Sequence, residues 1–386
     1  MKVLYTTGDA IWLAENGKSF ELPSYRAQQY LETIDRIAAN KAWKTTGRGA
    51  QFMGVAESQL PQEEIRPQFR GLALYRDEFL YTLQLDASGG MYRRDFAEKP
   101  SPEGHIVSGN DVRLGSICAR GDDVAACLLY PNGQSHIGLY QLPSSACTEI
   151  TGGDSVESAP SWTPDGRCIL FSSCGIGRGD RGIAYSPNVI MQYNVNSERM
   201  DTILEDEKFD FLAPKLDEQD NLWYIRQPYQ LGEERAGFGE IFLDILLFPF
   251  RILKAVGGFL NVFSMLFGGE SLQKNSQRSR DVKSKQRSEK DLFFEGNLIH
   301  AEENQKENQR SGDEHPGILP RNRVLIRRSP DGNEEIIARS VLDYTLTPEG
   351  VLWSNGTHIL LRGADGKDTV VTKTRLASKM QYLADC

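Results

Sequence analysis

Length, composition and charge limit the class of protein to which this chain can belong. The 386 residues are 39% hydrophobic and 25% charged, include 36 glycines and carry a formal net charge of -9. This balance is typical of a turn-rich globular protein and excludes a disordered one. The acidic charge argues against nucleic acid as a partner, because phosphate contacts require clustered Lys and Arg.

The N-terminus and the cysteines bear on the cellular compartment. Residues 1–5 are followed directly by Thr, Gly and Asp, so an apolar stretch of signal-peptide length is missing there. We therefore expect a cytoplasmic chain, unless a longer precursor was trimmed before residue 1. The six cysteines form no CxxC pair, and Cys127 and Cys168 lie in apolar runs. The cysteines are interpreted as buried free thiols.

The first strand-like run covers residues 4–13, and a helix is predicted to follow it. In residues 24–43, Tyr30, Ile34, Ile37 and Ala38 recur at helical spacing. The pattern indicates a helical insert at about 24–43.

Residues 160–173 contain the clearest local motif. Two short β-rich runs flank Pro164-Asp165-Gly166, in which Pro fixes φ, Asp can bond its own backbone and Gly tolerates a positive φ. This pattern predicts a β-hairpin. Degraded copies of it are found at residues 4–13, 74–81, 117–124, 215–224 and 346–353.

The hairpin motif resembles the WD40-like repeat of TolB-type β-propellers, in which an aromatic residue, Ser or Thr and Pro-Asp-Gly precede an apolar strand. Six copies imply six blades. Two of the five spacings between the copies match the roughly 40 to 45 residues of a four-stranded blade, and the others are too long. Breaks between blades are expected near residues 70, 112, 157, 210 and 343. We expect pairing between the chain ends to close the ring, with residues 376–383 as an extra strand beside the first blade.

The acidic and aromatic residues of the repeats are interpreted structurally. Carboxylates at the repeat turns are expected to cap backbone donors: Asp122, Asp123, Asp165, Asp217 and Asp220. Three tryptophans at corresponding strand positions are expected in the core between blades: Trp12, Trp223 and Trp353.

Two further patterns were considered as chemical sites. Residues 177–182 match GxGxxG, but a strand-like run follows where a dinucleotide site needs a helix, so a flexible blade loop is predicted. TolB-like propellers include metal-dependent uronate lyases with central histidines. That resemblance makes His105, His136 and His358 the residues of an alternative metal site.

Residues 228–318 are interpreted as an amphipathic and charged insertion within the fifth blade, which continues with strands at 323–328 and 334–338. Residues 241–267 are far more apolar than any other stretch. Asp244, Arg251 and Lys254 disfavour a simple membrane span, because central charges are costly in hydrocarbon. They gather on one side of a predicted helix, or of two short helices.

The insertion is predicted to contact a membrane or a protein partner. The contact residues are Phe242, Ile245, Phe248, Phe250, Ile252, Phe259, Phe263, Leu266, Arg251 and Lys254. The basic stretch 273–291 suits an anionic cytoplasmic leaflet. The open alternative is a helix that packs against the propeller or a partner, and residues 297–312 are expected to be disordered or loosely helical.

These expectations combine into one fold and two functional hypotheses. The fold is all-β, a six-bladed β-propeller with an α-helical apolar insertion in the fifth blade. Residues 1–227 hold blades 1 to 4 and the start of blade 5, and 319–386 complete blades 5 and 6. The favoured function is a non-enzymatic binding platform, peripheral on the inner membrane face, that needs no cofactor. The alternative is a propeller enzyme, a carbohydrate lyase or hydrolase, with its site at the central channel. The oligomeric state is left open.

Overall fold

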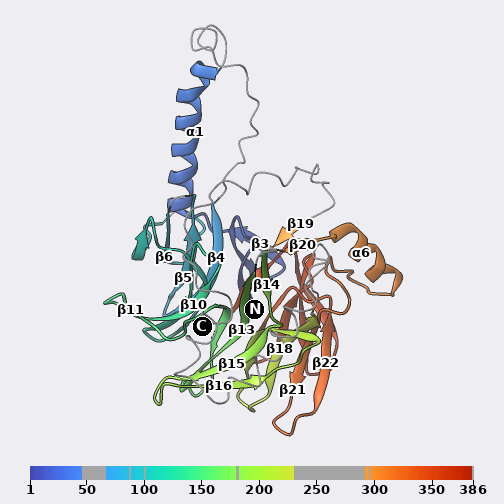
Figure 1. Ribbon diagram of the computed structural model, residues 1–386. Coiled ribbons are helices and arrows are strands. Elements are labelled where there is room, and N and C mark those ends of the chain that lie inside the picture. The colour runs from blue at the N-terminus through green and yellow to red at the C-terminus, as the bar shows by residue number, and fades with distance from the viewer. Residues whose placement is uncertain are drawn as a thin grey trace.

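The computed structural model describes residues 1–45, 67–86, 88–99, 101–179, 182–229, 292–294 and 297–384. Within these ranges the chain is mostly β-structure, as Figure 1 shows. The strands form six four-stranded antiparallel units and the short hairpin of β19 (Leu292–Phe294) and β20 (Asn297–Ile299). Units 3 and 4 are joined into one sheet by a single parallel bridge, Ser135 to Val156.

Units 1 to 3 follow the chain, except that the last strand of the chain is the first strand of unit 1. In pairing order, unit 1 has β27 (Ser378–Leu383), β1 (Lys2–Thr6), β2 (Ile11–Glu15) and β3 (Lys18–Glu21); unit 2 has β4 (Gln68–Tyr75), β5 (Glu78–Gln84), β6 (Gly89–Arg94) and β7 (Gly104–Gly109); unit 3 has β8 (Leu114–Arg120), β9 (Asp123–Leu129), β10 (Ser135–Gln141) and β11 (Ala146–Glu149). The predicted pairing of the chain ends is confirmed, because Lys2 lies opposite Leu383.

Units 4 to 6 follow in the same way. Unit 4 has β12 (Ser155–Trp162), β13 (Cys168–Gly179), β15 (Val189–Asn194) and β16 (Arg199–Leu204), with β14 (Gly182–Tyr185) paired to β13; unit 5 has β17 (Phe209–Leu216), β18 (Leu222–Pro228), β21 (Val324–Arg328) and β22 (Glu334–Arg339); unit 6 has β23 (Asp343–Thr347), β24 (Gly350–Ser354), β25 (His358–Gly363) and β26 (Asp368–Lys373). The two strands predicted after the insertion are confirmed as β21 and β22.

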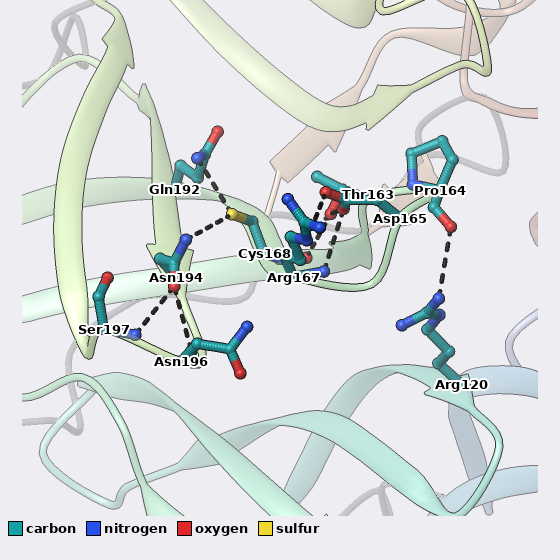
Figure 2. A network of polar contacts seen from close by, with 10 residues as sticks. All are labelled: Arg120, Thr163, Pro164, Asp165, Arg167, Cys168, Gln192, Asn194, Asn196 and Ser197. Carbon is teal, nitrogen blue, oxygen red and sulfur yellow. Dashed lines mark hydrogen bonds and ion pairs between the residues drawn. The ribbon is translucent and has the colours of Figure 1, made fainter.

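The hairpin predicted around Pro164-Asp165-Gly166 is confirmed. Asp165 Oδ1 accepts the Thr163 hydroxyl at 2.6 Å and the Arg167 N–H at 3.0 Å. Gly166 has a φ of +68°, which a side chain would strain. Figure 2 shows that the Pro164 carbonyl also accepts the Arg120 guanidinium of unit 3, at 3.5 Å. The turn therefore contributes to the contact between two units.

The turn role of Asp217 is likewise confirmed. Its carboxylate accepts the backbone N–H of Gln219 at 3.0 Å and of Asn221 at 2.8 Å, and the indole N–H of Trp223 at 2.8 Å. Burial acts to raise the pKa of this carboxyl, but these hydrogen bonds together bring it below its ordinary value. Asp122 has a different partner, the hydroxyl of Tyr75 in unit 2, at 2.8 Å.

The hydrophobic core lies between units rather than within them. Trp223 and Trp353 are buried in the cluster shared by units 5 and 6, and Trp12 is partly buried between units 6 and 1, as predicted. Each pair of neighbouring units shares a cluster that centres on a fully buried side chain: Tyr81 for units 1 and 2, Leu80 for 2 and 3, Phe171 for 3 and 4, Tyr224 for 4 and 5, Tyr344 for 5 and 6, and Tyr5 for 6 and 1.

Hydrogen bonds to the first strands follow the same cyclic order. They run from Gln381 Nε2 to Leu72 O (3.1 Å), from Thr82 Oγ1 to Gly115 O (2.8 Å), from Trp162 Nε1 to Cys118 O (3.3 Å), from Ser161 Oγ to Pro214 O (2.6 Å), from Lys215 Nζ to Tyr344 O (2.9 Å) and from Met380 N to Asp343 Oδ2 (3.0 Å). We call this set the inter-unit belt. It links unit 1 through each neighbour to unit 6 and back to unit 1.

Replacing one member of the inter-unit belt should destabilise the whole chain. Ser161→Ala leaves the buried Pro214 carbonyl without this donor, at a cost of about 1–2 kcal/mol of unfolding free energy. Ser144→Ala is the control, because Ser144 is exposed and bonds only within its own turn; it should cost below about 0.5 kcal/mol. Urea unfolding measures both, and equal effects of the two substitutions contradict a stabilising role for the belt.

Candidate functional site

The strand ends of the units form two different faces. Neighbouring strands of a unit are antiparallel. The connection between its second and third strands and the link from its fourth strand to the next unit therefore lie at the same end of the unit. We call this end the extension face. It carries residues 22–67 between β3 and β4, the β13–β14 hairpin, and residues 229–323 between β18 and β21. The opposite end carries short turns such as residues 163–167. The long excursions of the chain therefore leave from one face.

The predicted helix at 24–43 is confirmed as α1 (Tyr25–Thr45), and Figure 1 shows it projecting from the strands. Its first turn is bound by unit 2. The Glu103 carboxylate accepts the backbone N–H groups of Tyr25 at 3.0 Å and Arg26 at 3.1 Å. Such N–H groups have no partner inside a helix, and the helix dipole favours a negative charge there.

Further polar contacts hold the residues that lead into α1. Ser24 Oγ accepts the Ala27 N–H at 3.2 Å and shares a hydrogen bond of 3.1 Å with the Tyr81 hydroxyl. The guanidinium of Arg94, fully buried, donates to the Pro23 carbonyl at 2.5 Å. The direction in which α1 leaves the body is therefore fixed by its base.

The last part of the connection between β18 and β21 is more ordered than its composition predicts. Residues 301–310 form the helix α6 (Ala301–Arg310), so of the two alternatives predicted for residues 297–312 the helical one is confirmed there and the disordered one is wrong. The amide of Asn308, 1% exposed, donates to the carbonyls of Gly317 at 2.8 Å and Leu319 at 2.9 Å. A single buried amide and a few apolar contacts thus order a very polar segment.

Residues 315–318 dock onto the connection between β24 and β25. Asn355 Nδ2 donates to the His315 carbonyl at 2.7 Å, and the Ile318 N–H donates to the Asn355 carbonyl at 3.1 Å. The rings of His315 and His358 lie 5.0 Å apart. Burial lowers the pKa of His358, and the neighbouring His315 and Lys373 lower it further. Protonation of His358 therefore opposes docking of this segment.

Two charged side chains on the first strands of their units stand out, Lys215 and Glu157. Lys215 lies 5.2 Å from the centre of the Tyr344 ring, and burial lowers the pKa of its amine. The Glu157 side chain is 4% exposed, accepts the Ser173 hydroxyl at 3.1 Å, and has a pKa raised by burial. Lys215 donates to a backbone carbonyl in the inter-unit belt, so its role is structural.

The three histidines of the alternative metal site are not brought together. His105 lies on β7, the outermost strand of unit 2, beside Ser108. His136 lies on β10 between the Glu149 carboxylate and the Gly153 carbonyl. His358 belongs to unit 6. Across the part of the chain that the structure describes, no three His, Cys, Asp or Glu side chains could share a metal ion.

The GxGxxG match at 177–182 begins in β13 and ends at the first residue of β14. Gly179 pairs with Gly182 where β13 meets β14, so the predicted flexible loop is wrong for residues 177–179 and 182, which are paired strand residues. A helix does not follow within the described residues 182–229, so the N-terminal helix dipole that would bind a pyrophosphate is missing there.

The cysteines are free thiols, as predicted, in the part of the chain described. Cys127, Cys168 and Cys174 are buried, and burial raises the pKa of Cys127 and of Cys174 to about 12, which suppresses the reactive thiolate. The prediction is wrong for Cys147, which is exposed because all of β11 is exposed at the edge of unit 3.

The predicted contact residues all fall within 241–267, outside the described residues. The structure describes the elements that flank them in the chain: β18 precedes them, and α6 and β21 follow them. In the described ranges, the helices are too short or too polar to cross a membrane.

Comparisons with known proteins identify a structural likeness but no sequence relative. No family model and no curated protein matches the sequence. The chain is similar to TolB from Acinetobacter baumannii, with 10% identity and a TM-score of 0.47, over 98% of this chain and 65% of that chain. A TolB-like structure from Agrobacterium tumefaciens is 15% identical, with a TM-score of 0.31, over 40% of this chain and 52% of that one. Puromycin hydrolase is 8% identical, with a TM-score of 0.32, over 43% of this chain and 26% of that one.

The chain is similar to each of these structures at a TM-score below 0.5. It spans less than two thirds of the first TolB structure's length. Neither TolB's assembly nor the reaction of puromycin hydrolase follows from likenesses at this level.

Acidification should weaken the docking of residues 301–319. The unfolded chain takes up a proton at His358 near pH 6.5, whereas burial, and after it His315 and Lys373, lower the pKa of the folded His358, which takes up its proton at lower pH. Docking is therefore fully stable above about pH 6.5 and weakens as the pH falls below it. Hydrogen exchange of 301–319, corrected for the intrinsic pH effect, measures this. His358→Gln should flatten the profile and His105→Gln should not; an unchanged profile in His358→Gln contradicts the assignment.

Proposed function

We propose that the six units are the blades of one closed propeller ring. The shared hydrophobic clusters and the inter-unit belt support this, because both run from unit 1 to unit 6 and return to unit 1. The pairing of β27 with β1 lets the two chain ends complete one blade. A closed ring leaves no unit with an uncovered apolar face.

We further propose that this propeller is a non-enzymatic binding platform, held in the cytoplasm on the inner face of a membrane by residues 241–267. The observation that carries the proposal is the position of the insertion. β18 and β21 pair without interruption, with Tyr224 opposite Ile326, although residues 229–323 separate them in the chain. The four strands of unit 5 pair without residues 241–267, so the apolar residues of that stretch are not needed for the core of unit 5.

Charge supports an anionic lipid surface as the partner of the insertion. The whole chain is acidic, at -9, yet residues 273–291 carry Lys274, Arg278, Arg280, Lys283, Lys285, Arg287 and Lys290 against Asp281, Glu289 and Asp291. A wide apolar face next to basic residues is typical of helices that lie in the membrane interface. Asp244, Arg251 and Lys254 on the opposite side fit a surface position better than a span.

Deleting residues 238–291 should leave a folded propeller that no longer binds membranes. Both cut points lie between paired strands, and loop shortening costs little. We expect a cooperative melt within a few degrees of the intact chain, and loss of flotation with phosphatidylserine vesicles. An unfolded deletion variant means that the insertion is part of the core, which contradicts the platform proposal.

Apolar and basic residues of the insertion should contribute differently. Replacing Phe242, Ile245, Ile252 and Phe259 by Asp should abolish flotation with all vesicles, because apolar burial is lost. Neutralising the Lys and Arg of 274–290 should weaken binding to anionic vesicles only, and mainly at low salt. Failure of the intact chain to float with either kind of vesicle overturns the membrane proposal.

A further inference from the structure

Two histidine rings meet where the end of the long connection docks onto unit 6. His315 belongs to the docked segment 315–318, His358 is the first residue of β25, and the centres of their rings lie 5.0 Å apart. Both residues are half-buried, so the rings are partly accessible to solvent. The pair therefore joins two separate elements, the docked segment and unit 6, at a place that small ions can reach.

The hydrogen bonds of Thr357 fix the tautomer of His358. Thr357 Oγ1 lies 2.9 Å from Asn355 Oδ1 and 3.2 Å from the Pro316 carbonyl oxygen. Both atoms are acceptors, since Asn355 Oδ1 also binds the backbone N–H groups of Thr357 and His358. The single hydroxyl hydrogen is used there, so Oγ1 accepts the proton of His358 Nδ1, 2.9 Å away. Nε2 of the neutral ring then carries the lone pair, as is typical of a metal-binding histidine.

The backbone of His315 is already held beside His358. The His315 carbonyl accepts the side-chain amide of Asn355 at 2.7 Å, and the Ile318 N–H donates to the Asn355 carbonyl at 3.1 Å. The loop that makes these bonds, residues 355–357, leads directly into His358. The described residues make no hydrogen bond to the ring nitrogens of His315. A ligand shared by the two rings therefore has to order only their side-chain rotations, which keeps the entropy cost of binding low.

The separation of the two rings matches that of two imidazoles on one metal ion. A zinc ion lies about 2.0 Å from a ligating imidazole nitrogen, and so about 3.2 Å from the centre of the ring. Two such rings at roughly 90–110° around the ion have centres about 4.5–5.2 Å apart. The observed 5.0 Å lies in this range. Imidazole nitrogen is a ligand that Zn²⁺, Ni²⁺ and Cu²⁺ favour, whereas Mg²⁺ favours oxygen.

We propose that His315 and His358 together bind one divalent transition-metal ion of the zinc class. In the described ranges no third His, Cys, Asp or Glu side chain joins them, so water fills the other positions and the ion exchanges readily. The exposed Lys373 acts on His358 as a like charge and weakens the site, although solvent screens it. The bound ion fastens the docked segment to unit 6, so the end of the long connection has a metal-dependent clasp.

Calorimetric titration of the intact, EDTA-treated chain with Zn²⁺ alone tests the site. His315→Gln and His358→Gln should each weaken binding by roughly tenfold or more, because each removes one of the two protein ligands. His105→Gln is the matched control and should leave the affinity unchanged. Lys373→Gln should tighten binding, because it removes the like charge. Mg²⁺ should not compete with Zn²⁺ for this site.

Hydrogen exchange gives a second readout, from the clasp itself. Zn²⁺ at about one hundred times its dissociation constant should slow exchange of the amides of 315–319 roughly hundredfold where they open by undocking. His315→Gln should abolish this slowing, and its exchange without metal shows whether the segment still docks. If His358→Gln undocks the segment without metal, His315→Gln decides alone. Binding that is equally tight in both glutamine variants, or saturation that leaves the exchange of 315–319 unchanged, overturns the proposal.

Discussion

Each four-stranded unit of this protein has two faces, and only the neighbouring units keep these faces from water. The fully buried side chains Tyr5, Tyr81 and Tyr344 lie in clusters between units, so no unit has a core of its own. A small sheet with both faces exposed is not stable in water. The stability of every unit therefore depends on its two neighbours, and the pairing of β27 with β1 provides the last neighbour.

This dependence explains why the chain tolerates such long excursions. The inter-unit belt joins strands, and strand residues make up most of the clusters that neighbouring units share, to which the chain between β3 and β4 adds Leu22 and Ala27. Residues 229–323 can therefore separate β18 from β21 without changing their register. The same holds for the chain between β3 and β4, where Glu103 and Arg94 bind only the base of α1. A body of interdependent units with long extensions on one face is well suited to present binding elements.

Sequence reasoning succeeded where the signal is local. Pro164-Asp165-Gly166 requires a particular backbone shape, and the helical spacing of Tyr30, Ile34 and Ile37 belongs to one continuous segment, so both elements could be predicted. The C-terminal strand was found because closure of the ring demands one. The prediction failed where a polar residue has a distant partner. Asn308 orders α6 through carbonyls that only the folded chain brings near, and His315, which precedes β21 of unit 5, meets His358 of unit 6. The candidate contact residues at 241–267 stay a prediction.

The interdependence of the units is what allows the insertion and α1 to be peripheral elements. Native-state hydrogen exchange in increasing urea tests this most directly. The account predicts that the strands of all six units exchange through one global opening with a common free energy, while α6 and α1 open at lower cost. Exchange of any one unit, above all unit 1 with its β27–β1 pair, at a markedly lower free energy than the others would contradict it.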